Sequence, residues 1–180
     1  MRKVILYIAI SLDGKIARTD GSVDWLEKIP NPDQSDFGYF AFIKSIDTVL
    51  MGNKTYQQVL GFDVPYPYTD QTSYIFTRNT ALDKDENATF ISGNIGEFVR
   101  DLKQQDGKNI WLIGGGEIIY QLLEEGLVDE AVVHVMPIML GSGVPLVSKE
   151  LPDRYMTLME SKSYPGGAVE LRYSVNGSAS

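Results

Sequence analysis

The stretch WLIGGGEIIYQLL, from Trp111 to Leu123, joins an apolar run to a helical pattern through three consecutive glycines. Glycine between ordered elements costs conformational entropy, so a bare backbone must serve a purpose there. Either the turn is merely tight, or a ligand approaches the backbone closely. Amide groups at the start of a helix attract phosphate, and three glycines in a row favour phosphate binding over a plain turn.

This stretch is not the common dinucleotide-binding motif. In the pattern G-x-G-x-x-G, Gly114 and Gly116 fit the first two positions, but Ile119 stands at the third. Any phosphate site here therefore needs a different backbone arrangement.

Outward from the glycines, apolar runs typical of buried strands alternate with helical patterns. We expect strands over 4–10, 48–51, 73–77, 88–91, 109–113 and 131–136, and helices over 36–46, 54–60, 97–105 and 117–124. Strands over 157–164 and 168–175 flank a PGG turn and predict an antiparallel hairpin. This alternation predicts an α/β fold with a mostly parallel sheet covered on both faces. We expect one domain over 1–176, with a frayed tail over 177–180.

Composition excludes several classes of function. The 180 residues carry a net charge of −8, which argues against a nucleic-acid partner. With no cysteine and one histidine, we expect no disulfide, metal site or histidine-based triad. No run approaches the roughly 18 apolar residues that span a membrane, so we expect no membrane partner. The absence of cysteine is compatible with the cytoplasm, where we expect the protein to act.

Ligands of such folds bind beyond the carboxyl ends of the strands, which selects the loops after Ser11, Gly52 and Gly114. The motif MGNKTY, at 51–56, again places a glycine between a strand and a helix. Lys54 in that motif and Arg78 after the next strand could grip a phosphate. Taken singly, each is more typical of a surface residue.

Six motifs, in this order along the chain, carry a resemblance to a known family: SLDGKIA (11–17), DGSVDWL (20–26), MGNKTY (51–56), WLIGGGEI (111–118), GLVDE (126–130) and LGSGVPL (140–146). They resemble the dihydrofolate reductase-like superfamily, and most closely its branch with the reductase domain of bacterial riboflavin biosynthesis. The resemblance covers nearly the whole chain. It implies a three-layer sandwich with a mostly parallel central sheet and a C-terminal antiparallel hairpin. It also implies an oxidoreductase that uses NADPH.

The resemblance further implies which residues bind the cofactor. It implies that Gly52, Asn53, Lys54 and Thr55 hold the phosphates of the cofactor, and that Thr77 and Arg78 face its adenosine ribose phosphate. It places Gly114, Gly115 and Gly116 under the pyrophosphate, and Ala9 and Ile16 beside the nicotinamide. Many relatives carry arginine where Asn53 stands, so the preference for NADPH over NADH depends on Lys54 and Arg78. The resemblance also implies a cis peptide bond between Gly114 and Gly115.

Asp36 is the candidate catalytic acid and substrate ligand. Its position in the first turn of the expected helix, taken alone, indicates only that its negative charge complements the helix dipole. Its separation from Gly52, 16 positions, matches the spacing between the catalytic carboxylate and the glycine in dihydrofolate reductases. Asp13 is a rival for substrate contact, with a turn residue before Gly14 as the alternative. We expect His134 to be a half-exposed strand residue without a catalytic role.

Three functions remain open. The first is a reductase resembling 5-amino-6-(5-phosphoribosylamino)uracil reductase, and the second is a dihydrofolate reductase. Against folate, the segment GFDVPYP (61–67) has no arginine, and Trp25 lies eleven positions before Asp36 rather than a few. The third is a non-catalytic nucleotide-binding module. A chain without cysteine lacks the zinc deaminase of the bifunctional riboflavin proteins, so it would be a stand-alone reductase. The family suggests a homodimer with a small-molecule substrate.

Overall fold

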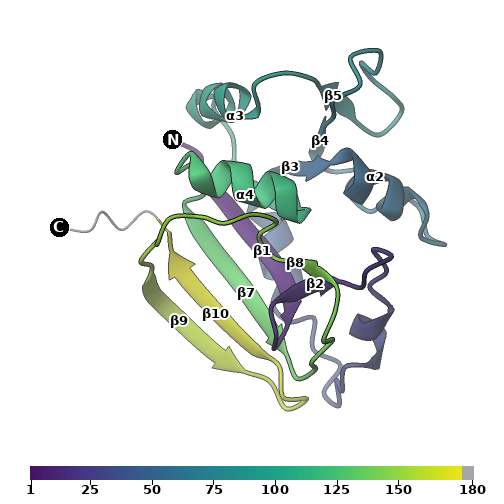
Figure 1. Ribbon diagram of the computed structural model, residues 1–180, viewed down its shortest axis with the longest axis vertical. Helices are drawn as coiled ribbons and strands as arrows, with labels where there is room; N and C mark the ends of the chain where they lie inside the picture. Colours follow the sequence, from purple (N-terminus) through teal and green to yellow (C-terminus); the bar gives the residue numbers. More distant parts are fainter. Residues whose placement is uncertain (176–180) are drawn as a thin grey trace.

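The computed structural model describes residues 1–175 and shows an eight-stranded sheet in the order β5-β4-β3-β6-β1-β7-β10-β9 (Figure 1). Its strands are β1 (Val4–Ser11), β3 (Ile46–Gly52), β4 (Thr72–Phe76), β5 (Thr89–Ile91), β6 (Asn109–Gly114), β7 (Glu130–Met136), β9 (Thr157–Ser163) and β10 (Val169–Ser174). Strands β1 and β3 to β7 pair in parallel, and the hairpin β9–β10 joins β7 antiparallel. The expected α/β fold is confirmed, while the expected frayed tail lies outside the described residues.

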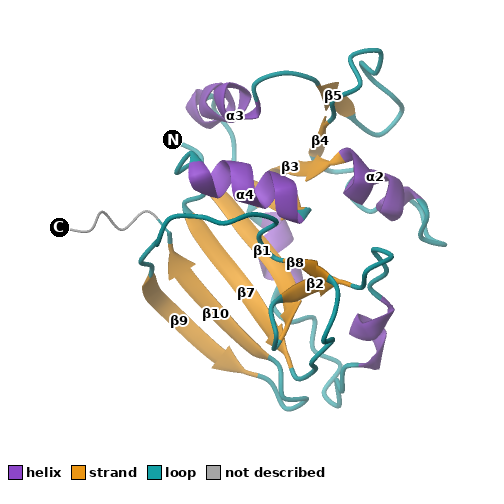
Figure 2. Ribbon diagram, viewed as in Figure 1, coloured by secondary structure: helices purple, strands orange, loops and turns teal. Residues whose placement is uncertain are grey.

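Helices cover both faces of this sheet, which makes three layers (Figure 2). Besides a 3₁₀ turn, η1 (Asp24–Lys28), they are α1 (Tyr39–Lys44), α2 (Asn53–Leu60), α3 (Ile95–Gln104) and α4 (Gly116–Glu124). Helices α3 and α4 pack on one face through Leu102 and Leu122, and α1 and α2 pack on the other through Phe42 and Tyr56. Strand β6 serves both layers because successive side chains point to opposite faces: Leu112 joins the first core and Trp111 the second.

Helix α1 is three residues shorter at its start than expected. Phe37 and Gly38 have φ of 51° and 81°, in the left-handed region that a right-handed helix cannot use. The helix therefore begins at Tyr39, and Asp36 lies in the loop before it. The periodic apolar residues of this segment predicted a helix correctly but not its first turn.

Two short strands form that were not among the expected strands. Strand β2 (Lys15–Ala17) pairs antiparallel with β8 (Val144–Pro145) in front of the main sheet (Figure 1).

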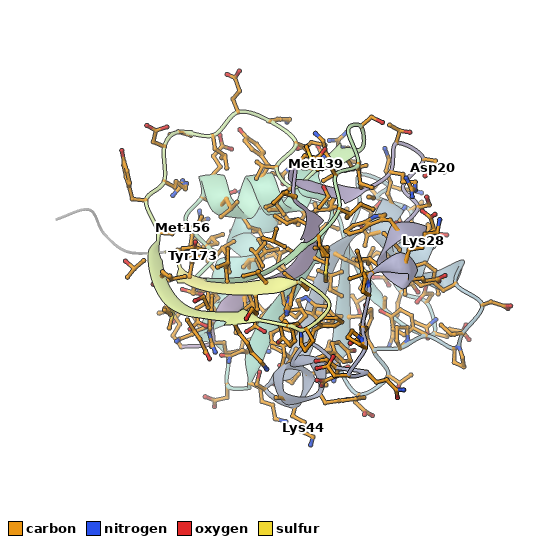
Figure 3. All side chains as sticks on the ribbon, turned by 90° about the horizontal axis from the view of Figure 1, so that it is seen from below. Asp20, Lys28, Lys44, Met139, Met156 and Tyr173 are labelled. Atoms are coloured by element: carbon orange, nitrogen blue, oxygen red, sulfur yellow. The ribbon has the colours of Figure 1, made fainter. Side chains whose placement is uncertain are left out.

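Seen from below, Met156 and Tyr173 of the C-terminal part lie on the opposite side of the view from Asp20 and Lys28 (Figure 3).

The segment 140–148, which contains β8, is anchored at both ends. The amide of Leu140 donates to a carboxylate oxygen of Asp13 at 3.0 Å, and the amide of Ser148 donates to the carbonyl of Gly116 at 3.4 Å. The segment thus connects the loop after β1 with the first residue of α4.

Candidate active site

The three loops that the sequence selected lie next to one another. Strands β3, β6 and β1 are adjacent and parallel, so their carboxyl ends, at Gly52, Gly114 and Ser11, meet at one edge of the sheet. Helices α2 and α4 start at this edge, directly after β3 and one residue after β6.

The starts of α2 and α4 approach each other closely. A Cβ atom added to Gly115 would lie 3.3 Å from the hydroxyl of Thr55, and one added to Gly52 would lie 3.2 Å from Cγ1 of Ile118. The peptide bond between Gly114 and Gly115 is cis, which confirms that expectation. Only residues without a side chain leave the space between the two helix starts open.

Both helix starts also keep their hydrogen-bonding capacity. Their N-cap residues, Gly52 and Gly115, have no side chain to cap the first amides, whereas Asn94 caps α3 by accepting from the amide of Glu97. Beside them, Oδ1 of Asn53 is buried without a partner among the described residues. A buried polar atom without a partner is costly, so this oxygen is an acceptor for a hydrogen-bond donor of a ligand.

Arg78 reaches the same edge from the loop after β4, but it already has a partner. Its side chain is 88 % exposed and forms an ion pair with Glu117 in the first turn of α4. The neighbouring Thr77 has its hydroxyl engaged by the amide of Asn79. Glu117 was not among the expected site residues, although an acidic residue next to a glycine-rich helix start is visible in the sequence.

A cavity of about 450 Å³ lies beside this edge, on the face that carries α1. It has the size of small-molecule sites and is mainly aromatic and apolar, as such sites are. Its lining residues are Tyr7, Ala9, Leu26, Glu27, Ile29, Asn31, Asp36, Phe37, Tyr39, His134 and Met136. Ala9 and Asp36 are therefore placed together, whereas Ile16, in β2, is not part of the lining.

Asp36 combines a position in the cavity wall with a structural task. Its Oδ1 accepts from the amide of Gly38 at 3.0 Å, and its Oδ2 accepts from the amide of Phe40 at 2.8 Å. These two backbone donors, that of Phe40 first, lower the pKa of Asp36. The side chain is exposed, and it is held as a carboxylate that accepts hydrogen bonds instead of donating a proton, as the expected catalytic acid would.

Asp13 does not reach the cavity. The hydroxyl of Ser11 and the amides of Leu140 and Gly141 donate to its carboxylate and hold its pKa at about 2. Gly14 follows in a turn with φ of 75°. The structure thus gives Asp13 the role of a turn residue that fixes one loop to another.

His134 was expected to be half-exposed, and this is wrong. It is 2 % exposed, lines the cavity, and lies with its ring centroid 4.9 Å from that of Tyr7. The hydroxyl of Tyr7 donates to the carbonyl of Phe37 at 3.0 Å. A single histidine inside an apolar strand was the available signal, but the strand pattern alone does not tell which face the cavity takes.

Comparison with known proteins supplies a family. A model described as "RibD C-terminal domain" matches residues 2–169. Two Bacillus subtilis (strain 168) proteins are similar over almost their whole length. Uncharacterized protein YwjB is 41 % identical over 172 residues, covering 96 % of this chain and 97 % of the relative. Uncharacterized protein YyaP is 34 % identical over 188 residues, covering 98 % and 96 %.

Solved structures agree. A Shewanella sp. PV-4 protein described as "Putative riboflavin biosynthesis protein" superposes with a TM-score of 0.85 at 32 % identity, covering 96 % of this chain and 98 % of that one. The Thermotoga maritima diaminohydroxyphosphoribosylaminopyrimidine deaminase/5-amino-6-(5-phosphoribosylamino)uracil reductase gives a TM-score of 0.74 at 16 % identity, covering 97 % of this chain and 56 % of that one. Enterococcus faecalis dihydrofolate reductase complexed with NADP(H) gives 0.66 at 14 %, covering 97 % and 96 %. The last two show that the fold is dihydrofolate reductase-like.

Proposed function

The chain belongs to the RibD C-terminal domain family, and from this premise we propose that it is a reductase that transfers a hydride from NADPH to a small heterocyclic substrate. The family and the riboflavin-biosynthesis neighbour support a reductase-like role. The observation that carries the proposal is the meeting of two uncapped helix starts, at Thr55 and Gly115, beside an aromatic cavity.

The residues of the sheet edge fit a nucleotide cofactor. The unpartnered Oδ1 of Asn53 is an acceptor that fits a ribose hydroxyl, and the open space at Gly115, beside the amides that start α4, fits a phosphate. We assign the phosphates to Gly52, Asn53, Lys54 and Thr55 on one side and to Gly114, Gly115 and Gly116 on the other. When bound, NADPH supplies the hydride.

The preference for NADPH depends on Thr77 and Arg78, which we assign to the adenosine ribose phosphate. Arg78 is ion-paired with Glu117, so a 2′-phosphate has to compete with that carboxylate for the guanidinium. Lys54, an exposed residue in the first turn of α2, is the second cation on this side. At the nicotinamide end we assign Ala9, which lines the cavity, and Ile16.

The cavity itself favours a planar substrate with N–H groups. Tyr7, Phe37 and Tyr39 offer aromatic surfaces, and the carboxylate of Asp36 can accept further hydrogen bonds beyond the two it already accepts. Asp36 thus orients the substrate and stabilises positive charge that develops on it during reduction.

Two substrates remain to be separated by experiment. A ribosylated aminopyrimidine phosphate is the substrate that the riboflavin branch suggests. Among the described residues no lysine or arginine lines the cavity, and this favours an unphosphorylated heterocycle such as a dihydropterin.

We further propose that the protein is a homodimer that acts in the cytoplasm. Within residues 1–175, no helix is long and apolar enough to cross a membrane.

A spectrophotometric screen tests the proposal. Purified protein is mixed with NADPH and with either dihydrofolate or 5-amino-6-(5-phosphoribosylamino)uracil, and the loss of NADPH absorbance is followed. Oxidation that depends on one of the two compounds supports a reductase and identifies its substrate class. Tight NADPH binding without oxidation supports the nucleotide-binding module instead, and the absence of NADPH binding overturns both.

A further inference from the structure

A second polar group in the cavity wall has no part in the roles assigned so far. Nε2 of His134 lies 3.0 Å from the carbonyl oxygen of Phe37 and 3.3 Å from Oε2 of Glu170. Both neighbours are acceptors, so Nε2 carries a hydrogen. Nδ1 is therefore the nitrogen that takes up and releases a proton, and within residues 1–175 it has no hydrogen-bond partner.

Glu170 is placed opposite His134 by the sheet. Strands β10 and β7 pair antiparallel with Glu170 in register with His134, so both side chains lie on the face that carries the cavity. The hydroxyl of Tyr164 donates to Oε2 of Glu170 at 2.7 Å, and Lys162 lies over the Tyr164 ring at 4.6 Å. A carboxylate held in this way orients the imidazole and stabilises its protonated form.

The other titratable groups around His134 are poor proton donors near neutral pH. Two backbone amides keep Asp36 ionised by lowering its pKa. Burial, the Glu170 carboxylate and the Asp36 carboxylate raise the pKa of Tyr7. Burial and the hydrogen bond to Glu170 raise the pKa of Tyr164. Histidine is the side chain whose ordinary pKa lies close to neutrality.

We propose that His134 is the general acid of the reduction and that Glu170 is its positioning residue, an inference that rests on the function proposed above. In the step, the substrate carbon of a C=N or C=O bond receives the hydride of the cofactor and forms a C–H bond. The π electron pair moves to the nitrogen or oxygen, which takes the proton from Nδ1 of His134. The substrate is reduced, the cofactor leaves oxidised, and solvent reprotonates the imidazole.

The first test reads the imidazole directly. His134 is the only histidine of the chain, so its ring signals in NMR spectra of the whole protein need no assignment. We expect the neutral ring to carry its hydrogen on Nε2. We expect Glu170→Gln to shift the nitrogen signals of the ring, because the variant removes the carboxylate that lies 3.3 Å from Nε2. A hydrogen on Nδ1, or ring signals that Glu170→Gln leaves unchanged, would overturn the arrangement.

The second test reads catalysis, with whichever of dihydrofolate and 5-amino-6-(5-phosphoribosylamino)uracil the parent reduces. We expect His134→Gln to lower kcat by roughly 10²–10⁴-fold and to remove the decline of kcat at alkaline pH, with NADPH affinity unchanged. Glu170→Gln should keep that decline but move it to lower pH. Glu150→Gln, at an exposed carboxylate outside the cavity, is the matched control and should change neither.

The outcomes separate the two proposals. In one outcome the parent protein oxidises NADPH, and His134→Gln, verified as folded by thermal melting, keeps kcat within threefold of the parent. This outcome overturns the role of His134 and leaves the proposed function standing. If His134→Gln does not fold, the shift of the pH profile in Glu170→Gln decides: an unmoved profile overturns the role. A parent protein that reduces neither compound overturns the function on which the role rests.

Discussion

Gly115→Ala tests the space between the two helix starts. The added methyl group would lie 3.3 Å from the Thr55 hydroxyl, which is only a few tenths of an ångström tighter than ordinary contact. The backbone of Gly115, with φ of −76°, suits alanine. We therefore expect the variant to fold, with a loss of stability below about 1 kcal/mol, or roughly 2–4 °C in Tm for a chain of this size.

NADPH binding should suffer far more than stability. A methyl group between α2 and α4 holds the pyrophosphate away from the amides at the start of α4. Losing one hydrogen bond to a charged group corresponds to about 1.5–3 kcal/mol, or roughly 10- to 150-fold in Kd. Fluorescence titration with NADPH measures the affinity, and thermal melting without ligand measures the stability.

Gly61→Ala is the matched control. Its Cβ would also meet a neighbour at 3.3 Å, the carbonyl oxygen of Gln58, and its φ of −80° also suits alanine, but it lies at the opposite end of α2. We expect a similar change in Tm and no change in NADPH affinity. If Gly115→Ala binds NADPH within threefold of the parent, the close-approach argument is wrong and the glycines form only a tight turn.

Three further predictions concern charged groups. Asp36→Asn should lower kcat by roughly 10²–10³-fold while NADPH affinity changes little, because the variant removes the negative charge that stabilises positive charge on the substrate; unchanged turnover would leave Asp36 only its structural role before α1. Arg78→Ala should weaken NADPH binding on the order of 10-fold and spare NADH, and equal effects on the two cofactors would refute its assignment to the 2′-phosphate. Stability should fall below about pH 4.5. Burial raises the pKa of Glu130, but hydrogen bonds from Lys3 and Arg172 outweigh burial and leave the pKa lowered. The stability that these hydrogen bonds contribute is therefore present above the pKa of Glu130 in the unfolded chain and is lost as the pH falls below it. Glu130→Gln should lower the free energy of unfolding at pH 7 by about 1–2 kcal/mol in urea titrations and flatten this pH dependence, and an unchanged acid profile would contradict it.

Most of the fold could be predicted because local sequence patterns mark its strands and helices. Apolar runs such as 109–113 end at glycine, and the helical pattern of α4 follows at once, so both boundaries were close to the observed ones. The two-residue strand β8 could not be predicted, since its pairing with β2 depends on contacts more than 120 positions apart. The first turn of α1 was overpredicted because nothing local shows that Phe37 takes a positive φ.

The features of the site also fall into those with a local sequence signal and those that depend on the folded sheet. Glycines at strand ends are a local signal, and the structure brings Gly52 and Gly115 to one edge. The ion pair of Arg78 with Glu117 and the pairing of Glu170 with His134 depend on strand order and register, which single-chain patterns do not specify. Asp36 was chosen for its spacing, yet its protonation behaviour follows from two backbone amides that only the folded loop supplies.

The anchoring of segment 140–148 has a consequence for how this chain can vary in length. One end is tied to Asp13 and the other to Gly116, whose Cα has no room for a side chain because a Cβ would lie 2.8 Å from the carbonyl of Pro145. An inserted or deleted residue between Leu140 and Ser148 must break one of these ties. Loops usually absorb length changes easily, but here we expect insertions to be tolerated only outside the segment.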